Sequence, residues 1–447
     1  MREFRFRKGL DLPVAGAPEQ KISAGPACHT VGVVGPDYLG LKPRLSVEED
    51  DEVRRGQTLF FHRDTPEAKI TAPVSGKIKA INRGARRVLE SIVIDVGDLG
   101  DMGMDFSSVG GEQDSEAVAE KLAEAGLWTS FRTRPYSKVP GVGERPAAIF
   151  VTAMDTEPLS PDAAMVISEA PEAFERGVAA IAKLCEGKTY VCHAIGAQIP
   201  ASSAPNVEAV GFSGPHPAGL PGTHIHFLHP PSAEQVVWTI WYQDVIAIGQ
   251  LMMTGHVDAS RIVSIGGPCC RNPRLIRTLA GASMHELTEA DRVSDVPIRL
   301  LSGSVLSGRA ADNRTAYLGR YARQISMLEE DFKQTVLGWI RPMPQKFAVQ
   351  PVLGSAFSRK LFNLTTNLNG GRRAMVPTGT FEELMPQDFL PTQLLRALLV
   401  MDTDTAQTLG ALELDEEDLG VVGFSCPAKY EYGLALRDCL EKIEKEG

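Results

Sequence analysis

The feature that most limits the fold of this chain is a change in its hydrophobic period near residue 115. Before that point, residues 45–100 carry short β-branched runs, separated by Gly, Pro and Asp turns, that are typical of strands. After it, apolar residues recur at helical spacing over Glu116–Ala125, and Gly126 follows as a C-terminal cap. A β segment followed by strands alternating with helices predicts several domains, one of them an open α/β sheet.

The pattern beyond residue 140 predicts individual elements. Ser232 and Gln235 form a capping-box pattern, and the apolar stripe from Trp238 to Met252 then predicts one core-facing helix. Pro391 opens a helical C-terminal unit, because proline is tolerated in the first turn of a helix. The other expected elements are strands at Ala148–Ala153, Thr189–His193 and Arg261–Ile265, and helices at Pro171–Glu186, Pro273–Ala280, Pro391–Val400, Thr405–Leu414 and Lys429–Glu444.

Composition excludes several classes of protein. The 447 residues suggest about three domains, and their net charge of −10 argues against general binding of nucleic acid. Seven cysteines without a CxxC pair predict free thiols, including the adjacent Cys269 and Cys270. The basic start Arg2–Lys8 has no apolar run behind it, so we expect no signal peptide, and the apolar stretch Val236–Met253 contains Asp244 and is a poor membrane span.

Residues 45–81 resemble a biotinyl/lipoyl-like barrel-sandwich domain. The resemblance rests on Asp51-Glu-Val-Arg-Arg-Gly56 and Ala72-Pro-Val-Ser-Gly76. A carrier domain of this type presents its lysine on an exposed hairpin, usually beside Met. Here Lys69 has Ala68 and Ile70 as neighbours, so we expect a structural barrel without a prosthetic group.

Motifs for nucleotides and metals are weak. Gly141-Val-Gly-Glu-Arg-Pro146 lacks the third Gly of a dinucleotide fingerprint and precedes a strand, and no phosphate-binding loop occurs. His216, His224, His226 and His229 cluster, and on a strand His224 and His226 would share one face. A metal site is one interpretation, and turn and surface histidines are the other, which we favour. The acidic run Glu413–Asp418 is interpreted as a solvated helix end.

Residues 127–138 mix aromatic rings with three cations after the helix end at Gly126, and we interpret them as a loop. Rings that stack and cations that polarise carbonyls suit a planar ligand with carbonyl oxygens. The alternative is a solvated loop with an aromatic anchor, and chemistry alone favours that alternative.

Segments along the whole chain together resemble the A subunit of the sodium-translocating NADH:quinone oxidoreductase. The segments that carry the resemblance, in order, are Lys8–Gly16, Thr71–Gly76, Arg132–Pro140, Val151–Thr156, Gly214–Leu220, Gly303–Gly308 and Cys426–Gly433.

The resemblance implies a fold of four units. They are an N-terminal biotinyl/lipoyl-like barrel-sandwich (1–100), a Rossmann-like open α/β sheet (112–258), a small β-grasp-like α+β unit (259–335) and, after a connection (336–378), a C-terminal helical unit (379–447).

It also implies a function within a translocase. The expected protein is a peripheral subunit, on the cytoplasmic face of the bacterial inner membrane, of a six-subunit respiratory complex that passes electrons from NADH to ubiquinone and exports sodium ions. Its relatives, the flavin subunit of complex I and the C subunit of Rnf complexes, carry a Gly-rich flavin loop and a four-cysteine cluster. Here Trp128–Lys138 without Gly and Cys426 alone stand at those positions. We therefore expect no flavin, NADH or iron–sulfur site in this chain, with flavins and iron centres in partner subunits.

The resemblance favours the aromatic and basic loop as the quinone site. We expect Phe131, Arg132, Arg134, Tyr136 and Lys138, with Tyr38 and Leu39, to border the quinone head group. Arg132 or Lys138 would donate to a carbonyl. The subunit is thus expected to be associated with the quinone-reduction end of the complex. The competing hypothesis is a scaffold that caps the membrane part of the complex and does no chemistry. No nucleophile–base pair or metal spacing is present, so we expect no catalytic residue and no metal site.

Overall fold

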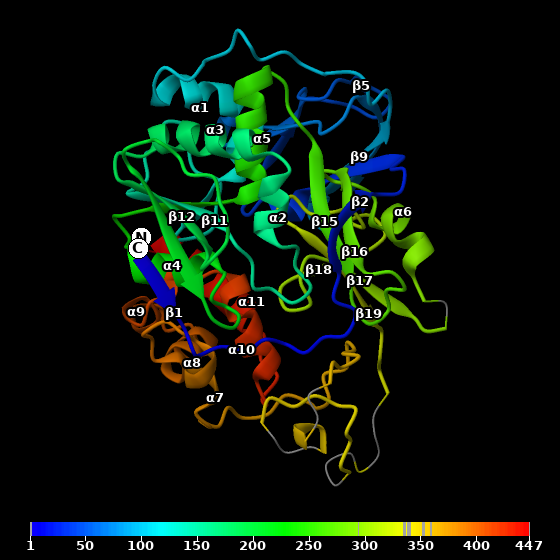
Figure 1. Cartoon of the computed structure of the whole chain (residues 1–447), viewed down its shortest axis with the longest axis vertical. Coiled ribbons are helices and arrows are strands. Elements are labelled where there is room, and N and C mark those ends of the chain that lie inside the picture. The colour runs from blue at the N-terminus through cyan, green and yellow to red at the C-terminus, as the bar shows by residue number, and fades with distance from the viewer. Residues whose placement is uncertain are drawn as a thin grey trace.

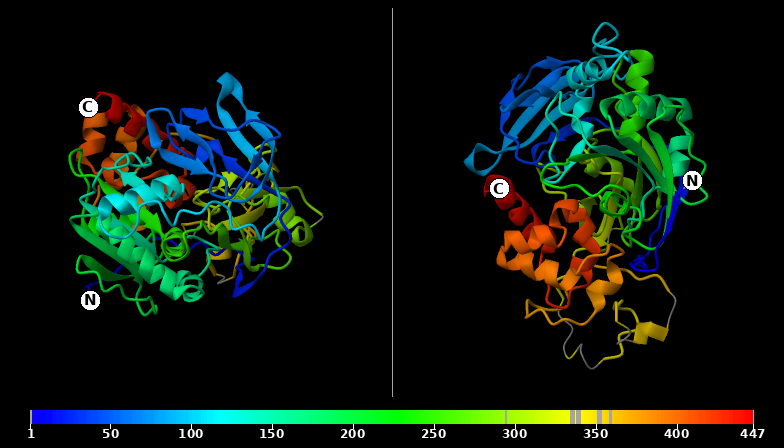
Figure 2. Two further views of the ribbon diagram at one scale, coloured as in Figure 1. Left: turned by 90° about the horizontal axis from the view of Figure 1, so that it is seen from above. Right: turned by 90° about the vertical axis from the view of Figure 1, so that its left-hand side faces the viewer.

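The computed structural model describes residues 2–293, 295–333, 337, 341–350, 354–357 and 360–446. Within them the chain forms four β-sheets and a helical C-terminal unit that packs against them (Figures 1 and 2). Parts of the predicted connection 336–378 lie outside the described residues.

The N-terminal β structure is a sandwich of two small antiparallel sheets, as residues 45–100 predict. Its core contains Val31, Phe60, Ile78 and Ile92, all of them fully or almost fully buried. The four-stranded sheet comprises β3 (Thr30–Val34), β9 (Leu89–Val96), β8 (Gly76–Arg83) and β5 (Glu52–Val53), and the three-stranded sheet comprises β4 (Pro43–Leu45), β6 (Thr58–His62) and β7 (Thr65–Thr71).

The second unit is the predicted open α/β sheet, in the order β1-β13-β12-β11-β14-β10. Its members are β1 (Arg2–Arg5), β13 (Val207–Ser213), β12 (Lys188–Ala194), β11 (Ala148–Ala153), β14 (Val237–Trp241) and β10 (Arg132–Arg134). All pairs are parallel except β10 with β14. The basic N-terminus is therefore an edge strand of this sheet, and the barrel-sandwich begins after it.

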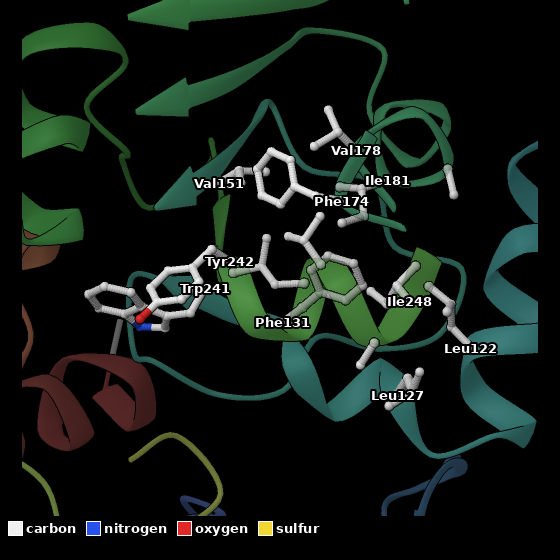
Figure 3. Packing of buried hydrophobic residues seen from close by; sticks show 14 of the residues in the cluster. Leu122, Leu127, Phe131, Val151, Phe174, Val178, Ile181, Trp241, Tyr242 and Ile248 are labelled. Carbon is white, nitrogen blue, oxygen red and sulfur yellow. The ribbon is translucent and has the colours of Figure 1, made fainter. Parts of the chain in front are cut away.

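Helices cover this sheet and enclose its core. Figure 3 shows Phe131, Phe174 and Ile248 directed into one apolar layer. Two glycines let α3 and α5 approach closely, because a Cβ at Gly249 would lie 1.7 Å from the carbonyl oxygen of Ala173 and one at Gly177 would lie 2.1 Å from that of Val245. The helices are α1 (Ser115–Glu124), α2 (Ala163–Ser168), α3 (Pro171–Ile181), α4 (Pro221–Leu228) and α5 (Tyr242–Thr254).

The predicted helix from residue 232 is wrong in its first part. β14 occupies Val237–Trp241, and α5 begins only at Tyr242. Ser232 Oγ accepts the N–H groups of Glu234 and Gln235 in a turn before the strand. A strand inside a parallel sheet that is covered on both faces is a continuous apolar run. Such a run also contains apolar residues at helical spacing, which is why the sequence pattern predicted a helix here.

The third sheet has the order β18-β17-β19-β15-β16-β2, flanked by the short helix α6 (Met284–Thr288). The predicted helix at 273–280 is wrong, because β16 lies there and pairs with both β15 and β2. The strands are β2 (Glu19–Ala24), β15 (Ser260–Gly266), β16 (Arg274–Leu279), β17 (Ile298–Ser302), β18 (Arg309–Ala310) and β19 (Gln324–Glu329).

The C-terminal unit is helical, as predicted, and has a core of its own around Leu394, Leu398, Leu436 and Leu440. Its helices are α7 (Thr380–Leu384), α8 (Pro391–Val400), α9 (Thr403–Thr408), α10 (Gly420–Ser425) and α11 (Tyr432–Glu446). The exact domain boundaries expected from the sequence stay a prediction. In the described part of the chain, no helix is long and apolar enough to cross a membrane.

Candidate functional site

The segment predicted as an aromatic and basic loop is instead built into the α/β domain. Residues Leu127–Ser130 form a 3-10 turn, and β10 then pairs with β14 with Arg132 opposite Thr239. Phe131 is completely buried, and its ring centroid lies 5.3 Å from that of Trp238. The polypeptide reverses over Pro135–Ser137, where Tyr136 and Ser137 have positive φ values of 77° and 57°. We call residues 131–138 the hairpin.

Two arginines of the hairpin point toward the C-terminal unit and meet a buried carboxylate there. Arg132 forms an ion pair with Asp415, Arg134 Nη2 lies 3.3 Å from Asp415 Oδ2, and Arg437 Nη2 lies 2.7 Å from Asp415 Oδ1. The side chains of Arg134 and Asp415 are 0% and 1% exposed. Burial by itself raises the pKa of Asp415, but the guanidinium groups of Arg132, Arg134 and Arg437 outweigh it and hold that pKa well below its usual range.

The acidic run 413–418 is therefore not a solvated helix end. Asp415 and Asp418 are each 1% exposed, and the N–H of Asp415 donates to Asp418 Oδ2 over 2.9 Å. Carboxylates enter the interior only where cations and N–H groups compensate them, and here the hairpin supplies the cations. The sequence pattern could not show those partners, which lie about 280 residues away.

The other end of the hairpin contacts both the C-terminal helix and the barrel-sandwich. Lys138 Nζ pairs with Glu444 of α11 at 2.6 Å, and the carbonyl of Tyr136 accepts a bond from Arg437 over 2.7 Å. A Cβ at Gly40 would lie 3.6 Å from Cε of Lys138. The turn that contains Tyr38 and Leu39 thus lies beside the hairpin, so the structure brings together the two segments in which the predicted quinone residues lie.

Tyr38 faces a pocket between three units of the molecule. The pocket is open to solvent and has a cavity volume of about 80 Å³. It is lined by Tyr38 and Asp37 from the barrel-sandwich, Thr129 from the 3-10 turn, and Arg261 and Arg320 from the third unit. Tyr38 is 7% exposed, and burial raises the pKa of its phenol. Of the seven predicted residues, Tyr38 alone is among those that line this pocket.

Charged groups around the pocket form a second network. Arg320 donates to Asp244 over 2.7 Å and to Ser130 Oγ over 2.7 Å, and its backbone N–H donates to Asp37 over 2.8 Å. Arg261 shares the carboxylate of Asp244 at 2.9 Å. Burial raises the pKa of Asp37 despite the nearby guanidinium groups of Arg309 and Arg320.

Tyr321 connects the pocket to the hairpin. The guanidinium carbons of Arg132 and Arg320 lie 5.0 Å and 5.6 Å from the centroid of its ring, and its hydroxyl donates to the carbonyl of Thr129 over 2.9 Å.

The sequence patterns did not single out Asp244, Arg320 and Tyr321 as site residues, although one signal is present. Asp244 lies within the apolar stretch 236–253, and a buried carboxylate requires a cation.

The four clustered histidines do not converge on one point. His224 and His226 lie on helix α4, not on a strand. His216 lies in a turn, as predicted, but His216 and His224 are fully buried, so the interpretation as surface residues is wrong for these two. Burial lowers the pKa of His216 to about 4 and that of His224 to about 3, which leaves both neutral near pH 7. His226 Nδ1 lies within hydrogen-bonding distance of Glu413, at 2.8 Å.

In the part of the chain that the structure describes, no group of three or more His, Cys, Asp or Glu side chains could hold a metal ion. All seven cysteines are free thiols, as their spacing predicts. Cys426 is buried with its sulfur 3.1 Å from the hydroxyl of Tyr432. Burial raises the pKa of Cys270 to about 11, so that thiol stays protonated near neutral pH.

Fold and site together define a class: a multidomain protein in which a barrel-sandwich, an α/β domain and a helical unit are joined through buried ion pairs. Three family models match the chain. They are the NqrA N-terminal barrel-sandwich hybrid domain over residues 4–97, the NqrA second alpha/beta domain over 113–257 and the NQRA C-terminal domain over 262–313.

Curated relatives extend the match to the full length. The A subunit of the Na(+)-translocating NADH-quinone reductase of Saccharophagus degradans is 51% identical over 447 residues, covering 99% of this chain and 100% of the relative. Those of Pasteurella multocida and Vibrio campbellii are 51% and 50% identical and cover 99% of both chains. The chain belongs to the family of the A subunit of the Na(+)-translocating NADH-quinone reductase, and it is thus part of a complex enzyme.

The solved structures that match are too dissimilar to support a conclusion about fold or function. An NAD+-reducing [NiFe]-hydrogenase in its H2-reduced state covers 49% of this chain at 13% identity, with a TM-score of only 0.37.

Proposed function

We propose that this subunit is associated with the quinone-reduction end of its complex and holds the ubiquinone head group where the Tyr38–Gly40 turn meets the hairpin. One observation carries the proposal: a pocket lined by Tyr38 and Arg320 opens at the start of this turn. A quinone is planar and has two carbonyl acceptors, so it needs an aromatic or apolar wall and a positive donor.

Arg320 is the donor that this geometry favours. Its described bonds go to Asp244 and Ser130, and a guanidinium has more N–H groups than these two bonds use. Asp244 and Ser130 hold the group in place before a ligand arrives, and a positioned cation stabilises negative charge that develops on a carbonyl oxygen. Tyr38 and Thr129 supply the wall.

The hairpin residues take different parts in the proposal. Phe131 and Arg134 are fully buried, so in this proposal they support the site without touching the ligand. Arg132, Tyr136, Lys138 and Leu39 are partly exposed and can touch a ligand at the mouth.

The remaining expectations from the family resemblance complete the proposal. The chain sits peripherally on the cytoplasmic face of the inner membrane in a six-subunit complex, and the flavins and iron centres belong to partner subunits. The lone Cys426, in contact with Tyr432 rather than with other thiols, supports the absence of a cluster. We further propose that the second sheet is Rossmann-like and that the third is β-grasp-like.

Calorimetric titration of the full chain with a short-chain ubiquinone tests the proposal. Saturable one-site binding is expected. Its affinity should fall about tenfold or more in Arg320→Lys, which removes the planar guanidinium, and in Lys138→Gln, which removes a charged donor. The matched control is Lys442→Gln, a lysine of α11 that pairs with Glu446 of the same helix. Absence of binding, or equal affinity in all variants, overturns the proposal.

One observation favours the scaffold alternative. Arg132 and Arg134 are engaged with Asp415, so they hold the C-terminal unit against the α/β domain. If Arg134→Met abolishes assembly of the complex while the isolated wild-type chain binds no quinone, the protein is a scaffold.

A further inference from the structure

A cluster of four carboxyl groups and three guanidinium groups lies where the C-terminal unit meets the hairpin of the α/β domain. Its members are Asp415, Glu416, Glu417 and Asp418, with Arg132, Arg134 and Arg437. Apart from Glu416, none of these side chains is more than 16% exposed. The carboxyl groups outnumber the cations by one, and an unbalanced charge in so closed a place is costly.

Asp418 is the carboxyl group that the arginines leave without a partner. No ion pair of Asp418 occurs within the part of the chain that the structure describes, whereas the other three carboxyl groups each have an arginine. The one described hydrogen bond to its carboxyl group comes from the N–H of Asp415, over 2.9 Å, and goes to Oδ2. Oδ1 is buried and has no described partner. A buried carboxylate anion normally accepts several hydrogen bonds, so these surroundings suit the neutral acid better.

Helix α4 lies against this carboxyl group. A Cβ at Gly222 would lie 2.4 Å from both carboxyl oxygens of Asp418, so the acid contacts the backbone of the first helical turn. Pro221, the first residue of α4, has no N–H to donate. Burial lowers the pKa of His224 to about 3 and keeps it neutral, and His226 bonds to a different carboxyl group. Among the described residues, α4 thus adds no positive partner for Asp418.

The charges that face Asp418 favour a bound proton. Burial raises the pKa of its carboxyl group above the ordinary value, and Glu417 and Asp415 add to this rise against the opposing effect of Arg134. The further titratable or charged groups around Glu417 are Glu157, His216 and Arg323. Asp418 therefore retains its proton at pH values at which an exposed aspartate has lost it.

We infer that Asp418 binds one proton when the C-terminal unit is docked on the α/β domain, and releases it to water when the two separate. The proton resides on Oδ1, because Oδ2 accepts the N–H of Asp415. Docking then forms one O–H bond, separation breaks it, and water is the only proton exchange partner. Because the separated state gives up a proton that the docked state keeps, acidification favours docking and a rise in pH weakens it. The inference stands independently of the proposed quinone role.

The neighbouring Asp415 has the opposite character. Despite its burial, the guanidinium groups around it hold its pKa well below the usual range, so it stays ionised where Asp418 titrates. The ion pairs of Arg132, Arg134 and Arg437 with Asp415 consequently persist over this range. The C-terminal unit is thus held by fixed ion pairs and adjusted by one proton.

Native-state hydrogen exchange of the full chain tests the inference, with α11 and the hairpin as reporters. The opening constant, corrected for the pH dependence of intrinsic exchange, is expected to rise up to about tenfold per pH unit between about pH 5 and pH 7, as one released proton requires. Asp418→Asn should lose that component, because its amide has no such proton to release. The matched control Asp404→Asn, which removes an exposed carboxyl group of α9, should keep it.

Two other carboxyl groups at this junction need variants of their own. Burial raises the pKa of Glu157 and of Glu416, so both release protons over a similar range. Glu157→Gln and Glu416→Gln are each expected to keep the component that Asp418→Asn removes. Infrared spectroscopy gives a second readout, since the band of a protonated carboxyl group near neutral pH should be lost in Asp418→Asn and remain in Glu157→Gln.

Equal pH dependence in wild type and Asp418→Asn, or the absence of a carboxyl band that depends on Asp418, overturns the inference. Should Asp418→Asn fail to fold, the other chains decide. An opening constant of α11 that stays level or falls from about pH 5 to about pH 7 in wild type overturns the inference, and a rise that persists in Glu157→Gln and in Glu416→Gln supports it.

Discussion

Arg134 and Asp415 form an ion pair that is closed to solvent on both sides, with side-chain exposures of 0% and 1% and 3.3 Å between Nη2 and Oδ2. Arg134 belongs to the edge strand β10 of the α/β domain, and Asp415 belongs to the C-terminal unit. The pair therefore joins two parts of the chain that are far apart in sequence. Desolvation makes such a pair costly to break from one side, because the charge that remains is buried without a partner.

Asp415→Asn is expected to destabilise the contact between the C-terminal unit and the α/β domain by about 3–5 kcal/mol, because Arg132, Arg134 and Arg437 lose their common anion. Hydrogen exchange of α8 and α11 measures the change locally, which suits a chain of several domains. Asp404→Asn, at an exposed position of α9, is the matched control and should change exchange little. Equal effects of the two substitutions would contradict a structural role for the buried pair.

Glu157 should make stability fall as pH rises from about 4.5 to about 7. Burial raises the pKa of this carboxyl from 4.5 to about 7, and Asp155 adds to the shift. In this window the folded state retains a proton that the unfolded state releases, so unfolding becomes easier as pH rises.

Denaturant unfolding at several pH values checks this expectation by comparing wild type with Glu157→Gln. Their difference in unfolding free energy should change by on the order of 3 kcal/mol across the window. Glu144→Gln, an exposed control, should run parallel to wild type. A parallel course for Glu157→Gln as well would rule out the raised pKa.

Gly249→Ala and Gly423→Ala should have opposite effects. A Cβ at Gly249 meets the Ala173 backbone at 1.7 Å, so α3 and α5 must separate, at a cost of about 2–3 kcal/mol. A Cβ at Gly423 in α10 has no neighbour within 4 Å, and alanine there should stabilise the helix by roughly 0.5–1 kcal/mol. Thermal unfolding of both variants measures the signs, and a stabilised Gly249→Ala would refute the close helix contact.

Lys69 should carry no lipoyl or biotinyl group. It lies within strand β7 and pairs with Glu124 of α1 at 2.5 Å, whereas a carrier lysine stands on an exposed turn. The intact mass of the protein purified from its native host should equal that of the unmodified sequence. An adduct that maps to Lys69 would contradict this prediction.

Local patterns were sufficient wherever the signal lies within one element. The strand Ala148–Ala153 and the helix Pro391–Val400 occur at the predicted residues, because a buried apolar run and a proline at the first helical turn are properties of neighbouring residues. The free thiols and the cap at Gly126, with its φ of 78°, follow from local chemistry in the same way.

The errors all concern segments whose environment is made by distant residues. β14 and β16 are strands because each pairs with neighbours on both sides, which outweighs a helical pattern. The sequence pattern suggested that both hairpin arginines were available to a ligand, but in the structure both of them pair with Asp415.

The sequence by itself determined the succession of a β unit, an α/β unit and a helical unit, and the residues that resemble one family. The tertiary structure alone decided which charged side chains are buried and which can reach a ligand. Arg134 is buried in an ion pair with Asp415, whereas Arg320 lines a pocket. The reason is physical: a pattern along the chain records what each residue prefers, but desolvation and ion pairing depend on partners that only folding brings within a few ångströms.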